Sequence, residues 1–133
     1  MFSVDLSIRE SDAHVVVELR GELDVADVAG VAAALAGVLA RPRQAVVDLA
    51  GLTFIDCSGV TALMQACKQA RRAGGDLLLA APSQQVLRVL TLTGLIDQFS
   101  VHPSVAEAAD SARRSRPAVQ PDAAGSSVLL PAE

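Results

Sequence analysis

Aromatic side chains are nearly missing from this sequence of 133 residues: it contains no tryptophan or tyrosine, and its aromatic residues are Phe2, Phe54 and Phe99. Proteins that bind single-stranded nucleic acid or sugars stack bases or rings on aromatic side chains, so neither activity is expected here. Hydrophobic residues nevertheless make up 51% of the sequence, which excludes general disorder. The core must therefore be built from valine, leucine, isoleucine and alanine.

Positive charge is also scarce. The chain carries 11 lysines and arginines against 15 aspartates and glutamates, a formal net charge of −4. A partner with a phosphate backbone calls for a basic face, so we expect no nucleic-acid partner. The basic pairs 71–72 and 113–114 each fall at the expected end of a helix, where the helix dipole favours cations.

Cysteine and histidine are too few and too widely spaced for a metal centre or a disulfide framework. Cys57 and Cys67 form no CxxC pair, and His14 and His102 each lack a second ligand at a useful spacing. The GxxxxGK[ST] run of a mononucleotide-binding loop is missing as well. We therefore expect no metal and no cofactor.

Long apolar runs are absent too. The apolar stretch 28–40 is too short to span a bilayer, and the first residues already alternate like a strand rather than a signal peptide. We expect neither membrane association nor export. From residue 116 onward, three prolines and no hydrophobic periodicity predict a flexible C-terminal tail, although an apolar triplet at 128–130 could dock. The expected division is a domain over 1–115 and a tail over 116–133.

What is present is an alternation of strand and helix patterns. Strand patterns occupy 2–8, 14–20, 46–49, 77–79 and 99–101, and helical spacing follows Asp24, Ser58, Ser83 and Pro103. Asp24 and Ser58 each stand where an N-cap belongs. Strands alternating with helices predict an α/β fold with a mixed, mainly parallel sheet of five strands, an antiparallel edge hairpin and four helices.

The most informative stretch is the central strand, the turn Asp-Cys-Ser-Gly at 56–59 and the helix after it. Unpaired N–H groups and the dipole make a helix start favourable for an anion, so a phosphate on Ser58 would meet hydrogen-bond donors. The simpler interpretation is that Ser58 is only a helix cap and Asp56 only fixes the turn. Cys57 could be a nucleophile, but no base accompanies it, and the favoured interpretation is a small side chain tucked against the turn.

Two short motifs give a resemblance to a known family. The turn at 56–59 and the segment Gly-Glu-Leu-Asp at 21–24, at this separation, resemble the STAS domain, and more narrowly the bacterial anti-sigma factor antagonists. The resemblance covers residues 2–114. This sequence departs from the family pattern at Cys57, where a hydroxyl residue is usual. Ser58 is therefore the one hydroxyl acceptor in the turn, with Thr53 and Thr61 nearby as weaker candidates for phosphorylation.

The resemblance implies a STAS-like fold and a function. Ser58 would be phosphorylated by a partner kinase, the 21–24 loop would lie beside the turn, and the chain itself would not be an enzyme. Unphosphorylated, it would bind an anti-sigma factor of the GHKL serine kinase type in a bacterial cytoplasm and free a sigma factor; a serine phosphatase would reset the switch. The implied partner-binding residues are Asp24, Asp56, Cys57, Ser58, Gly59 and Thr61.

Two other functions stay open at this point. STAS-like domains also serve as binding modules in transport assemblies and signalling scaffolds, where Ser58 would cap a helix and no phosphorylation would occur. A thiol-dependent enzyme using Cys57 is the remaining interpretation, and an active Cys57→Ser variant would exclude it.

Overall fold

A computed structural model describes residues 4–10 and 14–114. Within them the chain forms five strands, four α-helices and one short 3-10 helix. The strands are β1 (Val4–Glu10), β2 (His14–Leu23), β3 (Gln44–Ile55), β4 (Asp76–Ala80) and β5 (Ser100–His102). The helices are α1 (Val28–Val38), α2 (Cys57–Arg72), α3 (Gln84–Leu92), η1 (Ile96–Gln98) and α4 (Val105–Arg114).

The strands lie in the sheet in the same order as in the chain, β1-β2-β3-β4-β5. β1 pairs with β2 antiparallel, and the other three pairings are parallel. The mixed, mainly parallel sheet with an antiparallel edge hairpin is therefore confirmed. β1 lies at the sheet edge, as expected for a strand whose alternating pattern leaves one face in water.

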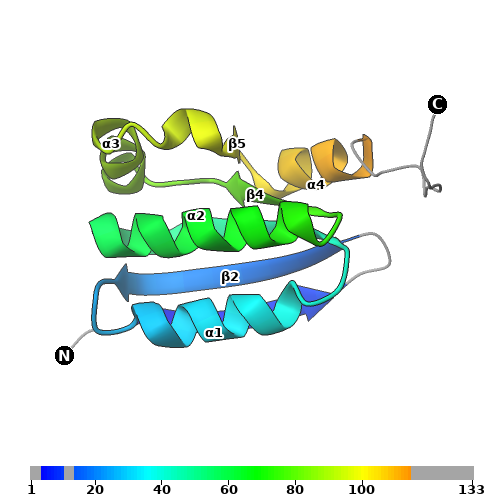
Figure 1. The fold of residues 1–133 in the computed structure, drawn as a ribbon. Coiled ribbons are helices and arrows are strands. Elements are labelled where there is room, and N and C mark those ends of the chain that lie inside the picture. The colour runs from blue at the N-terminus through cyan, green and yellow to red at the C-terminus, as the bar shows by residue number, and fades with distance from the viewer. Residues whose placement is uncertain (1–3, 11–13, 115–133) are drawn as a thin grey trace.

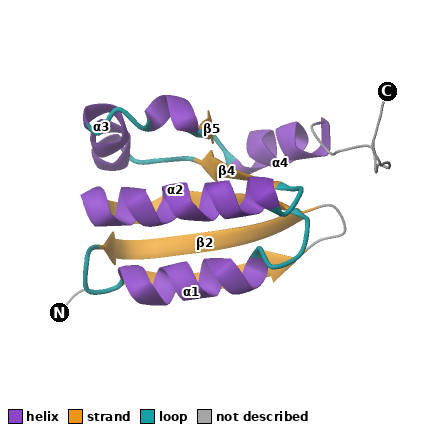
Figure 2. Cartoon of the chain, in the orientation of Figure 1, coloured by secondary structure: helices purple, strands orange, loops and turns teal. Residues whose placement is uncertain are grey.

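The helices cover the two faces of the sheet unequally (Figures 1 and 2). α1, α2 and α3 pack on one face, where leucine and valine side chains of the sheet meet those of the helices, among them Leu35, Leu63 and Leu90. α4 packs on the other face over a smaller cluster that includes Val46, Leu78 and Ala108. The core contains almost no aromatic side chains, as the composition predicted.

Both strands that lead to the two sequence motifs are longer than predicted. The strand pattern of β3 stopped at Leu49, but the strand continues to Ile55, and β2 beside it continues to Leu23. Two irregularities in their parallel register, near Arg20 and Gly21, let the pairing continue. Such bulges break the two-residue periodicity, which is why the pattern could not reveal the extension.

The helix ends follow the expected chemistry in most places. Ser83 caps α3, Ser104 accepts a bond from the first turn of α4, and Gly74 and Gly94 take positive φ after α2 and α3. The expectation that Asp24 caps α1 is wrong. The N-cap position is at Asp27, and the Asp24 carboxylate instead accepts the Ala26 N–H at 3.0 Å in a local turn.

In the part of the chain that the structure describes, no helix combines the length and the apolar composition needed to cross a bilayer. The expected tail at 116–133 lies outside the described residues.

Candidate functional site

The turn at 56–59 lies where β3 leaves the sheet and α2 begins. Asp56 has extended backbone angles and is the N-cap of α2: its Oδ1 accepts the Gly59 N–H at 3.0 Å. The expectation that Ser58 is the N-cap is therefore wrong, because the helix starts at Cys57 and Ser58 is its second residue. A carboxylate is among the best acceptors for an N-cap, so Asp56 is well suited to this position.

Ser58 is half-buried, with its hydroxyl held by the same carboxylate. Its Oγ donates to Asp56 Oδ1 at 2.5 Å. A hydroxyl bonded to an ionised carboxylate at this distance forms a strong, charge-assisted hydrogen bond. The Ser58 oxygen is thus fixed in direction at the start of α2 without being sealed inside the molecule.

Asp56 is the acceptor of several donors at once. Burial acts to raise the pKa of its carboxyl group, but hydrogen bonds from the Ser58 hydroxyl and from the backbone N–H groups of Gly59, Val25 and Ser58 lower that pKa below the ordinary value. The carboxylate is therefore ionised at neutral pH. It already accepts the Gly59 N–H at the start of α2, so a phosphate on Ser58 would meet a negative charge beside the expected donors.

The two sequence motifs lie side by side, as the resemblance implied. The Asp56 N–H, in the 56–59 turn, donates to the Leu23 carbonyl, in the 21–24 motif, at 3.3 Å. Gly59 closes the contact, because a Cβ at this position would lie 2.6 Å from Ile55 Cγ1 and 3.1 Å from Leu23 Cγ. Close approach of α2 to the sheet thus requires glycine at this position.

The side chains around Ser58 differ in their exposure. Cys57 and Thr61 are exposed, so the expectation that Cys57 is tucked against the turn is wrong. Thr61 Oγ1 donates back to the Cys57 carbonyl at 3.0 Å. Val25 is 75% exposed and extends the surface on the side of the 21–24 motif. Gly59 is buried, so its role is packing rather than direct contact.

One residue at the site gave no signal in the sequence. Gln85, in the first turn of α3, accepts the Ile55 N–H at Oε1 (2.9 Å) and donates from Nε2 to the Ile55 carbonyl (3.1 Å). It therefore holds the backbone of the residue immediately before Asp56. A glutamine beside another glutamine at a helix start has no distinctive pattern, and only the packing of α3 against β3 reveals the contact.

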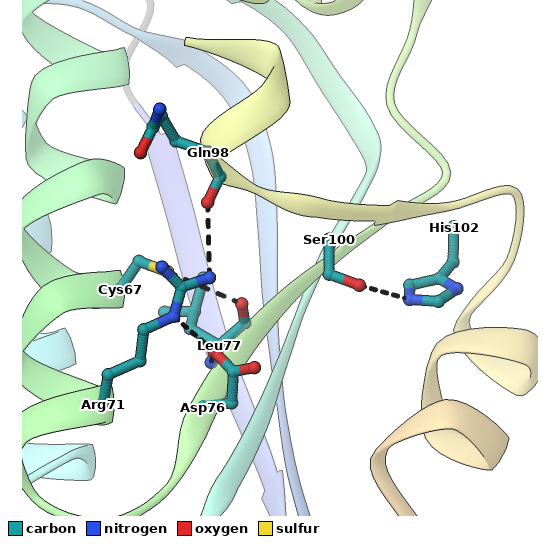
Figure 3. Close-up of polar contacts among 7 residues, drawn as sticks. All are labelled: Cys67, Arg71, Asp76, Leu77, Gln98, Ser100 and His102. Carbon is teal, nitrogen blue, oxygen red and sulfur yellow. Dashed lines mark hydrogen bonds and ion pairs between the residues drawn. The ribbon is translucent and has the colours of Figure 1, made fainter. Parts of the chain in front are cut away.

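A second group of polar side chains lies at the other end of α2 (Figure 3). Arg71 Nε donates to Asp76 Oδ1 at 3.1 Å and its Nη2 donates to the Gln98 carbonyl at 3.3 Å, which ties α2 to β4 and η1. Burial raises the pKa of the Cys67 thiol beside them, which donates to the Leu77 carbonyl. This group stabilises the fold and offers no exposed nucleophile.

The described residues contain no group of side chains that could bind a metal ion. Among residues 4–10 and 14–114, no three histidine, cysteine, aspartate or glutamate side chains gather closely enough to hold an ion. The side-chain groups held by hydrogen bonds at the start of α2 are the Ser58 hydroxyl and the Asp56 carboxylate.

Comparison with known proteins shows the family to which the chain belongs. The family described as STAS domain matches residues 5–108. The chain is 30% identical over 105 residues to the anti-sigma-F factor antagonist RsfA of Mycobacterium tuberculosis, covering 77% of this chain and 82% of that protein.

Solved structures share the fold. An anti-sigma factor antagonist from Mycobacterium paratuberculosis superposes with a TM-score of 0.77 at 24% identity, covering 84% of this chain and 95% of that one. The Bacillus cell fate determinant SpoIIAA in its phosphorylated form gives 0.61 at 23% identity, covering 84% and 98%. From its strand order, its adjacent motifs and these matches, the chain belongs to the STAS domain family.

Proposed function

We propose that this chain is an anti-sigma factor antagonist, which binds an anti-sigma factor of the serine kinase type and is switched off by phosphorylation at Ser58. The observation that carries the proposal is the Ser58 hydroxyl, held by Asp56 at 2.5 Å at the start of α2 and bordered by exposed Cys57 and Thr61. The naming of the M. tuberculosis relative as an anti-sigma-F factor antagonist supports the class of partner.

The chain acts as substrate and as ligand. The kinase partner supplies a nucleoside triphosphate, and Ser58 Oγ attacks its γ-phosphorus. The new Oγ–P bond forms as the bond from that phosphorus to the oxygen of the leaving nucleoside diphosphate breaks, and a base of the kinase takes the hydroxyl proton. The Asp56 carboxylate fixes the direction of the attacking oxygen, and no catalytic group of this chain is required.

The phosphate then changes the surface in two ways. The esterified oxygen can no longer donate to Asp56, and a group of charge about −1.5 to −2 lies beside an ionised carboxylate. Two like charges repel, and burying the added charge under a bound partner without a counter-charge costs several kcal/mol. Release of the partner follows, and a serine phosphatase restores the original state.

Calorimetric titration against the anti-sigma factor kinase of the same organism tests the proposal. The chain is prepared unmodified and with phosphoserine encoded at position 58. We expect the phosphorylated form to bind about 100-fold more weakly or worse, because each 1.4 kcal/mol changes the dissociation constant about tenfold. Ser58→Ala should bind like the unmodified chain and accept no phosphate.

Phosphoserine at Ser7 is the matched control for added charge, since Ser7 is exposed on the edge strand β1. It should leave the affinity unchanged. Equal affinity of the unmodified chain and the chain phosphorylated at Ser58 would exclude the switch. An intact mass that stays unmodified after incubation with kinase and ATP would favour a binding module without phosphorylation, and lost function in Cys57→Ser would favour a thiol enzyme.

A further inference from the structure

The last part of β3 has a strand neighbour on one side only. β3 pairs with β4 no further than Asp48 opposite Ala80, whereas its pairing with β2 continues to Leu23 opposite Ile55. On the side that β4 leaves open, the backbone N–H and C=O groups of Ile55 need other partners.

Gln85 supplies both partners from α3. Its amide oxygen accepts the Ile55 N–H at 2.9 Å, and its amide nitrogen donates to the Ile55 carbonyl at 3.1 Å. Donor and acceptor lie in one planar group, so the side chain does for Ile55 what a residue of a neighbouring strand would do. Both bonds are partly buried, which protects them from competition with water.

Ile55 contacts the turn at 56–59 through both its backbone and its side chain. It directly precedes Asp56, the carboxylate that holds the Ser58 hydroxyl. Its side chain lies against Gly59, where an added Cβ would come within 2.6 Å of Ile55 Cγ1. A change in the backbone of Ile55 therefore displaces both the N-cap and the first turn of α2.

We propose that Gln85 is a positioning residue for the phosphorylation of Ser58. By fixing the Ile55 backbone it sets the direction of the Asp56 carboxylate and, through it, the direction of the attacking Ser58 oxygen. The inference rests on the proposed function for its consequence, but the positioning itself is measurable without any kinase. Positioning of an attacking atom contributes to rate when the geometry is close to that of attack.

The test compares Gln85→Ala and Gln85→Glu with Gln84→Ala. Gln84 is the matched control: it is the same residue type in the same turn, it is exposed, and its side chain makes no hydrogen bond within the described residues. Gln85→Glu keeps the length and the acceptor for the Ile55 N–H but removes the donor to the Ile55 carbonyl, so it covers the case in which the alanine variant folds poorly.

The first measurement is the amide NMR spectrum and hydrogen exchange of the unmodified proteins. Both Gln85 variants should shift the Ser58 and Gly59 amide signals and speed exchange at Ile55, while Gln84→Ala leaves them in place. The second is the rate of phosphorylation by the kinase. We expect kcat/KM for Ser58 to fall at least tenfold in Gln85→Ala, mainly in kcat, with Gln84→Ala unchanged.

The two proposals fail in distinguishable ways. Absence of phosphate on the natural chain refutes the proposed function, and the NMR signals of Ser58 and Gly59 still decide whether Gln85 positions the turn. If those signals are the same in the natural chain and both Gln85 variants, the positioning role is refuted, whatever the kinase does. Shifted signals with an unchanged kcat refute its consequence for phosphorylation.

Discussion

At the scale of single residues, one carboxylate organises the site. Asp56 caps α2, holds the Ser58 hydroxyl and donates its N–H to the Leu23 carbonyl at the end of β2. The positive end of the α2 dipole is thereby neutralised before any modification takes place. A phosphate added to Ser58 would meet this carboxylate at the start of α2.

The ionisation of Asp56 should appear in the pH dependence of stability. Its folded-state pKa lies below the ordinary value of 3.8. A lowered carboxyl pKa contributes stability above the unfolded pKa and loses it as pH falls through the folded pKa. We therefore expect the advantage of the natural chain over Asp56→Asn to be constant from neutral pH down to about pH 5 and to shrink as pH falls below about 4.

Urea unfolding of both proteins at a series of pH values measures this difference. Asparagine caps helices about as well as aspartate, so a loss of the cap itself does not dominate the comparison. A difference that stays constant down to pH 3 would mean that the charge of Asp56 contributes nothing to stability.

Phosphorylation of Ser58 should raise the pKa of Asp56, which the hydrogen bonds of the unmodified chain lower. With Oγ esterified, Asp56 loses the Ser58 donor and gains a negative neighbour, and both changes favour its protonated form. We expect the pKa of Asp56 to be higher in the phosphorylated chain than in the unmodified one. An NMR titration of the Asp56 side-chain carboxyl carbon measures it; an equal or lower pKa would show that the phosphate points away from the carboxylate.

At the scale of secondary-structure elements, the site depends on how closely α2 approaches the ends of β2 and β3. Gly59 permits that approach, with Leu23 on one side and Ile55 on the other. Both neighbours are fully buried branched side chains, so neither can move aside freely. The packing of this one glycine therefore links the two sequence motifs mechanically.

Gly59→Ala should destabilise the fold by about 1–3 kcal/mol, because the added methyl group overpacks the contact. Gly30→Ala in α1 is the control, since Gly30 is exposed and has no atom within 4 Å of a new Cβ. There we expect stabilisation of up to about 1 kcal/mol from helix propensity alone. Urea unfolding measures both; similar effects at the two positions would contradict the close contact at Gly59.

The pattern of elements was predictable from the sequence because periodicity and capping act locally. Ser83 marked the start of a helix correctly. The site was less predictable. Asp56 and Ser58 are both good N-cap residues, and only the extended backbone of Asp56 decides between them. The contact of Gln85 with Ile55 joins residues thirty positions apart, which no local pattern encodes.

At the scale of the whole molecule, the described elements end with α4, which covers the second face of the sheet. Because no hydrophobic period follows it in the sequence, we expect the chain truncated after Ser115 to keep its free energy of unfolding within about 0.5 kcal/mol of the full chain. Its affinity for the anti-sigma factor should also stay the same. A loss of more than about 1 kcal/mol, measured by urea unfolding, would assign the removed residues a part in the fold.

The strands have the same order in the sheet as in the chain, and this order affects how the protein can fold during its synthesis. During synthesis, each strand after β1 leaves the ribosome when one of its neighbours in the sheet has already been made. No strand has to insert between two strands made before it, so each new pairing joins strands that follow one another in the chain, which favours fast assembly for a parallel sheet. Growth can proceed in one direction, from the first hairpin outward, with each newly made strand and helix adding to a surface that already exists.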